Sequence, residues 1–272
     1  MKKKLNLCIP QWQDSGYTKE LYYGTIALKN YIEKKNISFR NINVSQLNEL
    51  KEENNIVGYD VISKQLRLIR NTLNEEKPDI IFTIGGGCGI EIPLISYLSE
   101  EINDLKIIWF DAHGDINSPE TSKSKYFHGM PLRFLLEEIE GNVISEESKK
   151  ISKANLLLLG TRDLDKEEET YIRNNRIEMI SVFEHRMNDK KILNLVSEKI
   201  YLHIDLDVID PEVYKNVKCP VPEGFKIEEV VEIIKLIKGK NEIVGISILE
   251  NIEKNNKEIE KLKEIIEFGI EL

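Results

Sequence analysis

The chain has 272 residues, of which 31% are charged, and its formal net charge is −9 at neutral pH. This acidity argues against general nucleic-acid binding, because phosphate neutralisation needs a basic surface. The longest apolar runs are strand-sized and too short to cross a bilayer, and the three cysteines fit a reducing compartment better than a disulfide framework.

Short β-branched apolar runs alternate with helix-period segments, as is typical of a parallel sheet covered by helices on both faces. The pattern predicts strands at Leu5–Ile9, Phe39–Val44, Asp79–Ile84, Lys106–Phe110, Asn155–Leu159, Glu178–Ser181, Ile200–Asp205 and Ile243–Ile248. It predicts helices at Thr18–Glu33, Asp60–Leu73, Glu91–Glu100, Pro131–Glu138, Lys166–Asn174, Ile227–Ile237 and Glu258–Phe268. The fold class expected is therefore α/β.

The organisation of the chain indicates a single unit. No linker, low-complexity tract or repeat interrupts the sequence. Met1–Leu5 runs directly into a strand-like segment, with no apolar signal region or cleavage site after it. We therefore expect one domain over residues 1–272, located in the cytoplasm and partnered by neither a membrane nor a nucleic acid.

Unusual polar residues follow four of the predicted strands. They form the segments Gly85–Gly89, Asp111–Asp115 and Asp205–Asp207, and the single residue Glu250. Open parallel sheets bind ligands in the crevice beyond the carboxyl ends of their strands. The sequence therefore predicts a functional site at this edge of the sheet.

Four aspartates at neighbouring strand ends need compensating charge, because an uncompensated buried carboxylate costs several kcal/mol. Asp111, Asp115, Asp205 and Asp207 carry enough negative charge to neutralise two divalent cations, and His113 adds a nitrogen donor. A lone DxD pair is commonly only a turn or a helix cap. Two such motifs on separate strands favour a metal centre.

These residues resemble the ureohydrolase family, which comprises arginase, agmatinase and formimidoylglutamase. Asp111–Asp115 reads DAHGD and matches the DAHxD motif, while Asp205–Pro211 reads DLDVIDP and resembles the DxDxxDP motif. The similarity extends in the same order from Gly85 to Glu250. It implies a three-layer α/β/α arginase-like fold with an eight-stranded parallel sheet, and a metal-dependent hydrolase acting on the C–N bond of a linear amidine.

The resemblance also implies a ligand set for two Mn²⁺ ions, since oxygen donors with imidazole suit manganese. Asp111 and Asp205 would bridge both ions. Asp115 would complete one site, while His113 and Asp207 would complete the other. A water between the ions would attack a planar guanidino carbon, and Asp115 would take its proton.

Two further residues have roles implied by the family. His128 lies in Phe127–Pro131, which resembles the HGxP segment of arginases, where the histidine shuttles a proton. The alternative is a surface-loop histidine. Glu250 would pair with the guanidinium group of the substrate.

Substrate selection depends on two segments. Thr161–Asp165 resembles the RDxD stretch of arginases, so Asp165 would face the α-ammonium group of the substrate. Asn117 and Ser124 lie where the family binds the α-carboxylate. We therefore expect an arginine-like amino acid. The alternative for Asp163 and Asp165 is helix N-capping before Lys166.

The main departure from the family is Cys88. The family's GGDH turn ends in a histidine that ligates the first metal, whereas this chain reads Gly-Gly-Gly-Cys. Cys88 is therefore either a thiolate ligand or a small buried cysteine without a metal role. A thiolate makes the cluster about one unit more negative, which favours the more easily activated Nω-hydroxy-L-arginine, with ornithine and hydroxyurea as products, over L-arginine and urea.

Several alternatives stay open at this level. His203 shares the strand parity of Asp205, so it either supports the metal site or faces the other side of the sheet. The function is alternatively that of a formimidoylglutamase or agmatinase-type ureohydrolase, or of a catalytically inactive arginase-like binding protein. A phosphate site at Gly85–Gly89 is disfavoured because no Lys-Ser/Thr pair follows the glycines. The resemblance is also compatible with a homo-oligomer.

Overall fold

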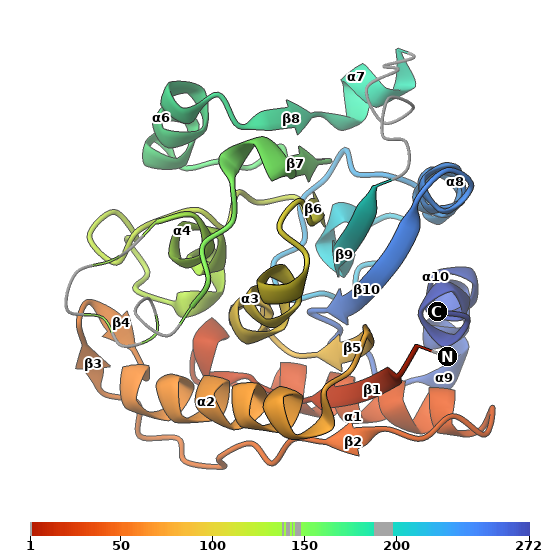
Figure 1. The fold of residues 1–272 in the computed structure, drawn as a ribbon, viewed down its shortest axis with the longest axis horizontal. Coiled ribbons are helices and arrows are strands. Elements are labelled where there is room, and N and C mark those ends of the chain that lie inside the picture. The colour runs from red at the N-terminus through yellow and green to blue at the C-terminus, as the bar shows by residue number, and fades with distance from the viewer. Residues whose placement is uncertain (1, 138, 140–141, 143, 145–147, 188–197) are drawn as a thin grey trace.

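The computed structural model describes residues 2–137, 139, 142, 144, 148–187 and 198–272. At its centre lies one eight-stranded sheet in the order β2-β1-β5-β10-β9-β6-β7-β8, and every pairing within it is parallel (Figure 1). The strands are β1 Lys4–Ile9, β2 Arg40–Asn41, β5 Ile80–Gly85, β6 Lys106–Phe110, β7 Leu156–Leu159, β8 Glu178–Ile180, β9 Lys199–Asp205 and β10 Glu242–Leu249. The expected eight-stranded parallel sheet is confirmed.

Helices connect the strands. They are α1 Glu20–Glu33, α2 Tyr59–Glu76, α3 Glu91–Glu101, α4 Pro131–Leu136, α6 Lys166–Asn175, α7 Val182–Arg186, α8 Ile227–Lys238, α9 Asn256–Ile259 and α10 Lys263–Ile270. Short 3₁₀ turns occur at η1 Gln13–Ser15, η2 Cys88–Ile90, η3 Phe127–Gly129, η4 Lys153–Asn155, η6 Leu206–Val208 and η7 Glu260–Leu262, and a small hairpin pairs β3 Glu52–Glu53 with β4 Ile56–Val57.

Two hydrophobic cores lie on opposite faces of the sheet and make the three layers. One core is formed with apolar residues of α1, α8 and α10, and the other with those of α2, α3 and α4. Side chains alternate along each strand, so both faces of the central strands are apolar. In β10, seven of the eight residues are buried. This double burial explains the near-continuous Ile and Leu runs of the sequence.

Three predicted elements were wrong in extent. The strand predicted at Phe39–Val44 is only Arg40–Asn41, because β2 is an exposed edge strand that pairs with β1 alone. The helix predicted at Glu258–Phe268 is interrupted by the turn Glu260–Leu262. The helix predicted from Pro131 ends at Leu136, and its predicted last residue, Glu138, lies outside the described residues.

The strand order decides where the polar segments meet. β5, β10, β9 and β6 are consecutive neighbours in the middle of the sheet, and all run in the same direction. The polar segments that follow these strands therefore lie together at the carboxyl ends of the strands. They are Gly85–Gly89, Asp111–Asp115, Asp205–Asp207 and Glu250.

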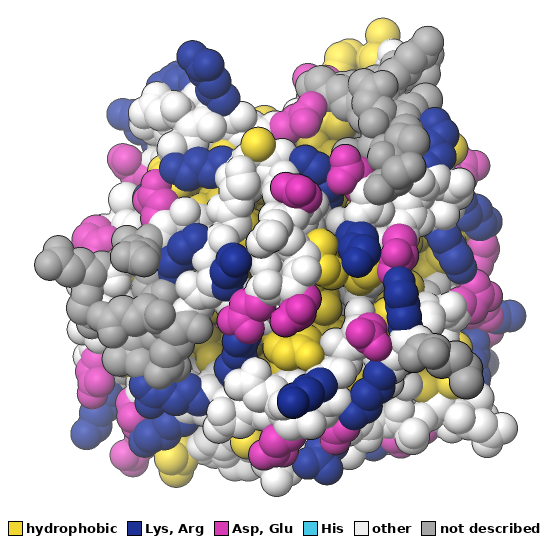
Figure 2. Space-filling model, viewed as in Figure 1, with side chains coloured by type: hydrophobic (Ala, Val, Ile, Leu, Met, Phe, Trp, Pro, Cys, Tyr) yellow, Lys and Arg dark blue, Asp and Glu magenta, His cyan; other side chains and the backbone are white. Residues whose placement is uncertain are grey.

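Many of the acidic side chains lie on the solvent-exposed outer surface. On the face shown in Figure 2, acidic and basic side chains are interspersed. Many exposed carboxylates pair with lysine or arginine, as Glu271 does with Lys238. Within the described residues, no helix combines the length and apolarity needed to span a membrane.

Candidate active site

Two aspartates from neighbouring strands and a histidine form one half of the site floor. His113 Nδ1 lies 2.9 Å from Asp207 Oδ2 and 3.4 Å from Asp111 Oδ1. The second oxygen of Asp207 accepts the backbone N–H of Ala112 at 3.0 Å, which fixes the orientation of that carboxylate. Asp111, His113 and Asp207 present one ligand atom each within 4.8 Å of one another, so together they are suited to hold a cation.

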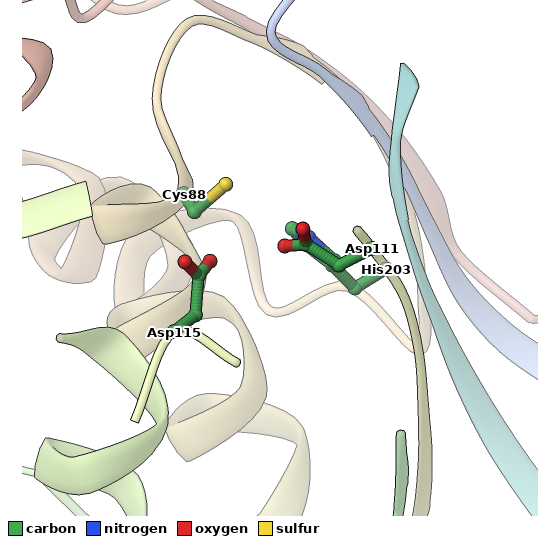
Figure 3. Close-up of side chains that lie close together, drawn as sticks. All are labelled: Cys88, Asp111, Asp115 and His203. Carbon is green, nitrogen blue, oxygen red and sulfur yellow. The ribbon is translucent and has the colours of Figure 1, made fainter. Parts of the chain in front are cut away.

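Cys88 organises the other half of the floor. It starts η2, directly before α3, and its Sγ donates to Asp205 Oδ2 at 3.2 Å. Figure 3 shows the Cys88 sulfur and the carboxylates of Asp111 and Asp115 pointing toward a common space. The ligand atoms of Cys88, Asp111, Asp115 and His203 lie within 4.8 Å of one another, as do those of Cys88, Asp205 and Glu250.

The floor has a strong excess of buried negative charge. Asp111, Asp115, Asp205 and Asp207 are each at most 4% exposed. Burial first, and then neighbouring carboxylates, raises the pKa of Asp115 and of Asp205 well above the ordinary range. Burial and the same carboxylates also raise the pKa of the Cys88 thiol. Positive charge placed among these groups would reverse all three shifts.

The donor set fits two divalent cations. It combines carboxylate oxygens with imidazole and sulfur, and Asp115 Oδ2 is a buried oxygen with no hydrogen-bond partner among the described residues. An orphaned buried acceptor is costly unless something binds it. The candidate metal ligands Cys88, Asp111, His113, Asp115, Asp205 and Asp207 are therefore all brought together at the floor.

Two of the candidate site residues have unusual backbone conformations. Asp115 has φ 50° and Glu250 has φ 60°, both in the left-handed region that side chains rarely adopt. Such residues cost on the order of 1–3 kcal/mol and cluster at functional sites. The Glu250 N–H donates to Gly86 O at 2.9 Å, which ties the end of β10 to the glycine turn.

His128 and Glu250 form the side wall. His128 Nδ1 lies 3.1 Å from Glu250 Oε1, and Ser15 Oγ donates to the same oxygen at 3.3 Å. Burial by itself would lower the pKa of His128, but its hydrogen bond to Glu250 and the negative charge of Glu250 raise it. The His128 side chain is only 21% exposed, so it belongs to the cavity wall and not to a surface loop.

The rim carries the residues expected to select the substrate. Asp165 is the N-cap residue of α6, yet its carboxylate accepts from Asn117 Nδ2 at 3.3 Å and from Lys123 Nζ at 2.8 Å. Ser124 lies beside Ser122, with 3.5 Å between their hydroxyl oxygens. Floor and rim enclose a cavity of about 250 Å³, lined by His113, Asp115, Asn117, Ser122, Lys123, Ser124, His128, Gly129, Asp165, Glu168, Asp205, Asp207, Cys219 and Glu250.

Comparison with known proteins identifies the family of the chain. The sequence model described as Arginase family matches residues 20–252. The chain belongs to the arginase family. It is a metal-dependent amidinohydrolase, and the family is known for binuclear metal centres.

Individual relatives cover most of the chain. It is 29% identical to an arginase of Plasmodium berghei over 242 residues, which are 83% of this chain and 68% of that protein. It is 27% identical to an arginase of Staphylococcus aureus over 276 residues, with 93% and 89% covered. The structure of an Entamoeba histolytica arginase superposes with a TM-score of 0.81 at 21% identity, covering 97% of each chain, and supports the arginase fold.

Asp14, which no sequence motif singled out, lies against the turn that departs from the family's GGDH. Asp14 is fully buried, and its Oδ2 accepts the Gly89 N–H at 3.1 Å. A Cβ added to Gly87 would lie only 2.3 Å from Asp14 Oδ1. The Asp14 carboxylate thus fills the space that the aspartate side chain of a GGDH turn would enter. The sequence signal was an acidic residue just beyond β1, the neighbour of β5.

The arginine of the arginase-like RDxD stretch has a structural role. Arg162 Nη2 donates to the backbone oxygens of Asp207 and Val221 at 2.8 and 2.7 Å, and its Nε donates to Pro222 O at 2.9 Å. These charge-assisted bonds brace the segment that holds Asp207. Arg162 therefore links the Thr161–Asp165 segment to the segment that holds Asp207.

Proposed function

We propose that this arginase-family enzyme uses two Mn²⁺ ions to cleave the guanidino group of an arginine-like amino acid. The substrate is Nω-hydroxy-L-arginine or L-arginine, and the products are ornithine plus hydroxyurea or urea. The observation that carries the proposal is one cavity whose floor has the acidic cluster and whose rim has Asn117, Ser124 and Asp165. We further propose that it acts in the cytoplasm on a free small molecule, without a nucleic-acid or membrane partner.

The family resemblance implies which residues would hold the two ions: Cys88, Asp111, His113, Asp115, Asp205 and Asp207. Among the donor groups, Asp111 lies close both to His113 with Asp207 and to Cys88 with Asp115. When bound, two divalent cations supply Lewis acidity and lower the pKa of a water. Among the described residues, Asp115 Oδ2 has no hydrogen-bond partner, so it is suited to accept a proton within the cavity.

Glu250 and His128 would both act on the guanidino group of the substrate. Glu250 is positioned to accept hydrogen bonds from a guanidinium, the geometry in which a carboxylate binds most strongly. Its pairing with His128 favours the protonated imidazole, and a protonated His128 can deliver a proton to the leaving amine. The two residues lie in direct contact, so proton delivery and guanidinium binding occur at the same place.

The rim would hold the amino-acid end of the substrate. Asp165 presents a carboxylate for the α-ammonium, and Asn117 and Ser124 present donors for the α-carboxylate. Lys123 pairs with Asp165, but its side chain is 79% exposed, so this ion pair is weak and easily opened by an incoming ammonium. The freed Lys123 would then lie beside the α-carboxylate.

The experiment is a comparison of kcat/KM for manganese-loaded protein on four substrates: Nω-hydroxy-L-arginine, L-arginine, agmatine and formimino-glutamate. The thiolate of Cys88 is expected to favour Nω-hydroxy-L-arginine, and Cys88→His should move activity toward L-arginine. Faster cleavage of agmatine or formimino-glutamate would instead identify an agmatinase-type enzyme or a formimidoylglutamase. Uptake of two manganese ions without cleavage of any of the four substrates would point to an inactive binding protein.

A further inference from the structure

The proposed chemistry leaves a fully buried histidine and glutamate unused. His203 lies on β9 two residues before Asp205, and Glu91 is the first residue of α3, just after the Cys88 turn. Both have 0% exposure. A buried ionisable pair costs free energy unless its remaining polar atoms are also satisfied. The neighbours of the two His203 ring nitrogens show which groups the imidazole faces.

The strand pairing and the alternation of side chains place His203 on the same face of the sheet as Asp111 and Asp205. His203 pairs with Trp109 across the β9–β6 ladder, and the two rings stack with 3.5 Å between centroids and 11° between planes. Trp109 and Asp111 are two residues apart in the chain, and so are His203 and Asp205. Side chains two residues apart along a strand project from the same face, and Trp109 is paired with His203, so all four lie on one face of the sheet. Trp109 Nε1 donates to Asp111 Oδ2 at 3.0 Å. The imidazole of His203 therefore cannot turn away from the carboxylate cluster without losing its stacking on Trp109.

The two ring nitrogens of His203 have different environments. Nδ1 lies 3.0 Å from Glu91 Oε1. Nε2 lies 3.7 Å from Asp111 Oδ2 and has no hydrogen-bond partner among the described residues. A carboxylate that accepts the Nδ1 proton leaves a lone pair on Nε2, and this is the arrangement found around metal-binding histidines.

We propose that His203 Nε2 is a metal ligand, and that Cys88, Asp111, Asp115 and His203 together hold one of the two cations. Their ligand atoms lie within 4.8 Å of one another. Glu91 is then a positioning residue that fixes the tautomer and ring orientation. The imidazole that a GGDH turn after β5 would supply comes here from β9, which is separated from β5 by β10. This inference rests on the proposed dinuclear centre.

The donor set has a consequence for metal choice. Sulfur, imidazole and two carboxylates make this half softer than the half formed by His113, Asp207 and the shared aspartates. The Cys88–His203 half should therefore gain more affinity than the His113 half when Mn²⁺ is replaced by Co²⁺ or Zn²⁺.

The first experiment titrates metal-free full-length protein with Co²⁺ and measures bound equivalents together with the thiolate-to-cobalt absorption of Cys88. Wild type should bind two equivalents. His203→Ala should weaken one of them more than about 100-fold, and Glu91→Gln should weaken the same one by about 10–100-fold, as removal of an outer hydrogen-bond partner does. His185→Ala, a histidine on α7 outside the cavity, should change neither. Unchanged affinities in His203→Ala would overturn the proposal.

The second experiment needs no variant and so decides the matter if His203→Ala fails to fold. Pulsed electron paramagnetic resonance on Mn²⁺-loaded protein, with ¹⁵N in histidine only, counts the imidazoles bound to the centre. Two couplings, from His113 and His203, support the proposal; a single coupling overturns it. A protein that binds two ions and cleaves its substrate with one imidazole would refute this inference alone, whereas a protein that binds no ions would refute the proposed function as well.

Discussion

The floor and the rim of the cavity are built in different ways. The floor residues Cys88, Asp111, Asp205 and Glu250 come from the ends of central strands and are 1–2% exposed. The rim residues Lys123 and Asp165 come from connecting segments, and their side chains are 79% and 37% exposed. Rigid, desolvated groups suit charge stabilisation, whereas exposed groups on loops suit recognition. We therefore expect floor substitutions to change kcat and metal binding, and rim substitutions to change KM.

The largest effect is expected from Asp205→Asn. Asp205 accepts from the Asp207 N–H and from Cys88, and it would be shared by both cations. The variant should lose bound metal and lower kcat/KM by more than about 10³-fold, because both ions lose a charged ligand. Metal analysis and steady-state kinetics measure this, with exposed Asp104→Asn as the matched control. Full activity with two ions still bound would show that the floor is not a metal centre.

A rim substitution should act on substrate binding instead. Asp165→Ala removes the carboxylate proposed to bind the α-ammonium, a charged hydrogen bond worth about 1.5–3 kcal/mol. KM for the amino-acid substrate should rise by about 10–100-fold while kcat stays within about 3-fold. Glu167→Gln, in the first turn of the same helix, is the control and should leave both constants unchanged. A fall in kcat with KM unchanged would place Asp165 in the chemical step.

The contact between Asp14 and the glycine turn can be tested on stability. Gly87→Ala places a Cβ 2.3 Å from Asp14 Oδ1, so it should lower the free energy of unfolding by about 1–3 kcal/mol. In an Asp14→Gly background the same substitution should cost less than about 1 kcal/mol, since the obstructing carboxylate is gone. Urea denaturation of the four proteins gives the coupling energy. Additive effects would mean that the two positions do not compete for space.

The smallest effect concerns pH. Burial is the main cause that raises the pKa of Asp14 to about 6 from an ordinary 3.8. The folded state therefore binds the proton more tightly than the unfolded state, and this contribution to stability is present below about 3.8 and lost as pH rises through about 6. For metal-free protein, wild type should lose about 1–3 kcal/mol more than Asp14→Asn between these values. Parallel stability curves for the two proteins would contradict the assignment.

Sequence periodicity predicted the central strands well, because residues buried on both faces leave continuous apolar runs. Lys106–Phe110 has the predicted bounds. No end of β5, β9 or β10 differs from its predicted position by more than one residue. The edge strand β2 was overestimated, since its exposed residues have a single hydrogen-bonded neighbour. Strands that are buried on both faces were therefore the ones that the sequence predicted accurately.

The residues of this chain by themselves determined the α/β class, the arginase-like motifs and the six candidate metal ligands, because these are local patterns at strand ends. Only the tertiary structure decided that Asp14 fills the space beside Gly87. It also decided that His203 Nε2, which has no hydrogen-bond partner in the described part of the chain, faces Asp111. Those contacts join residues far apart in the chain through the order of parallel strands. Spacing along a sequence carries no information about which strands become neighbours, and strand order is the physical cause of both arrangements.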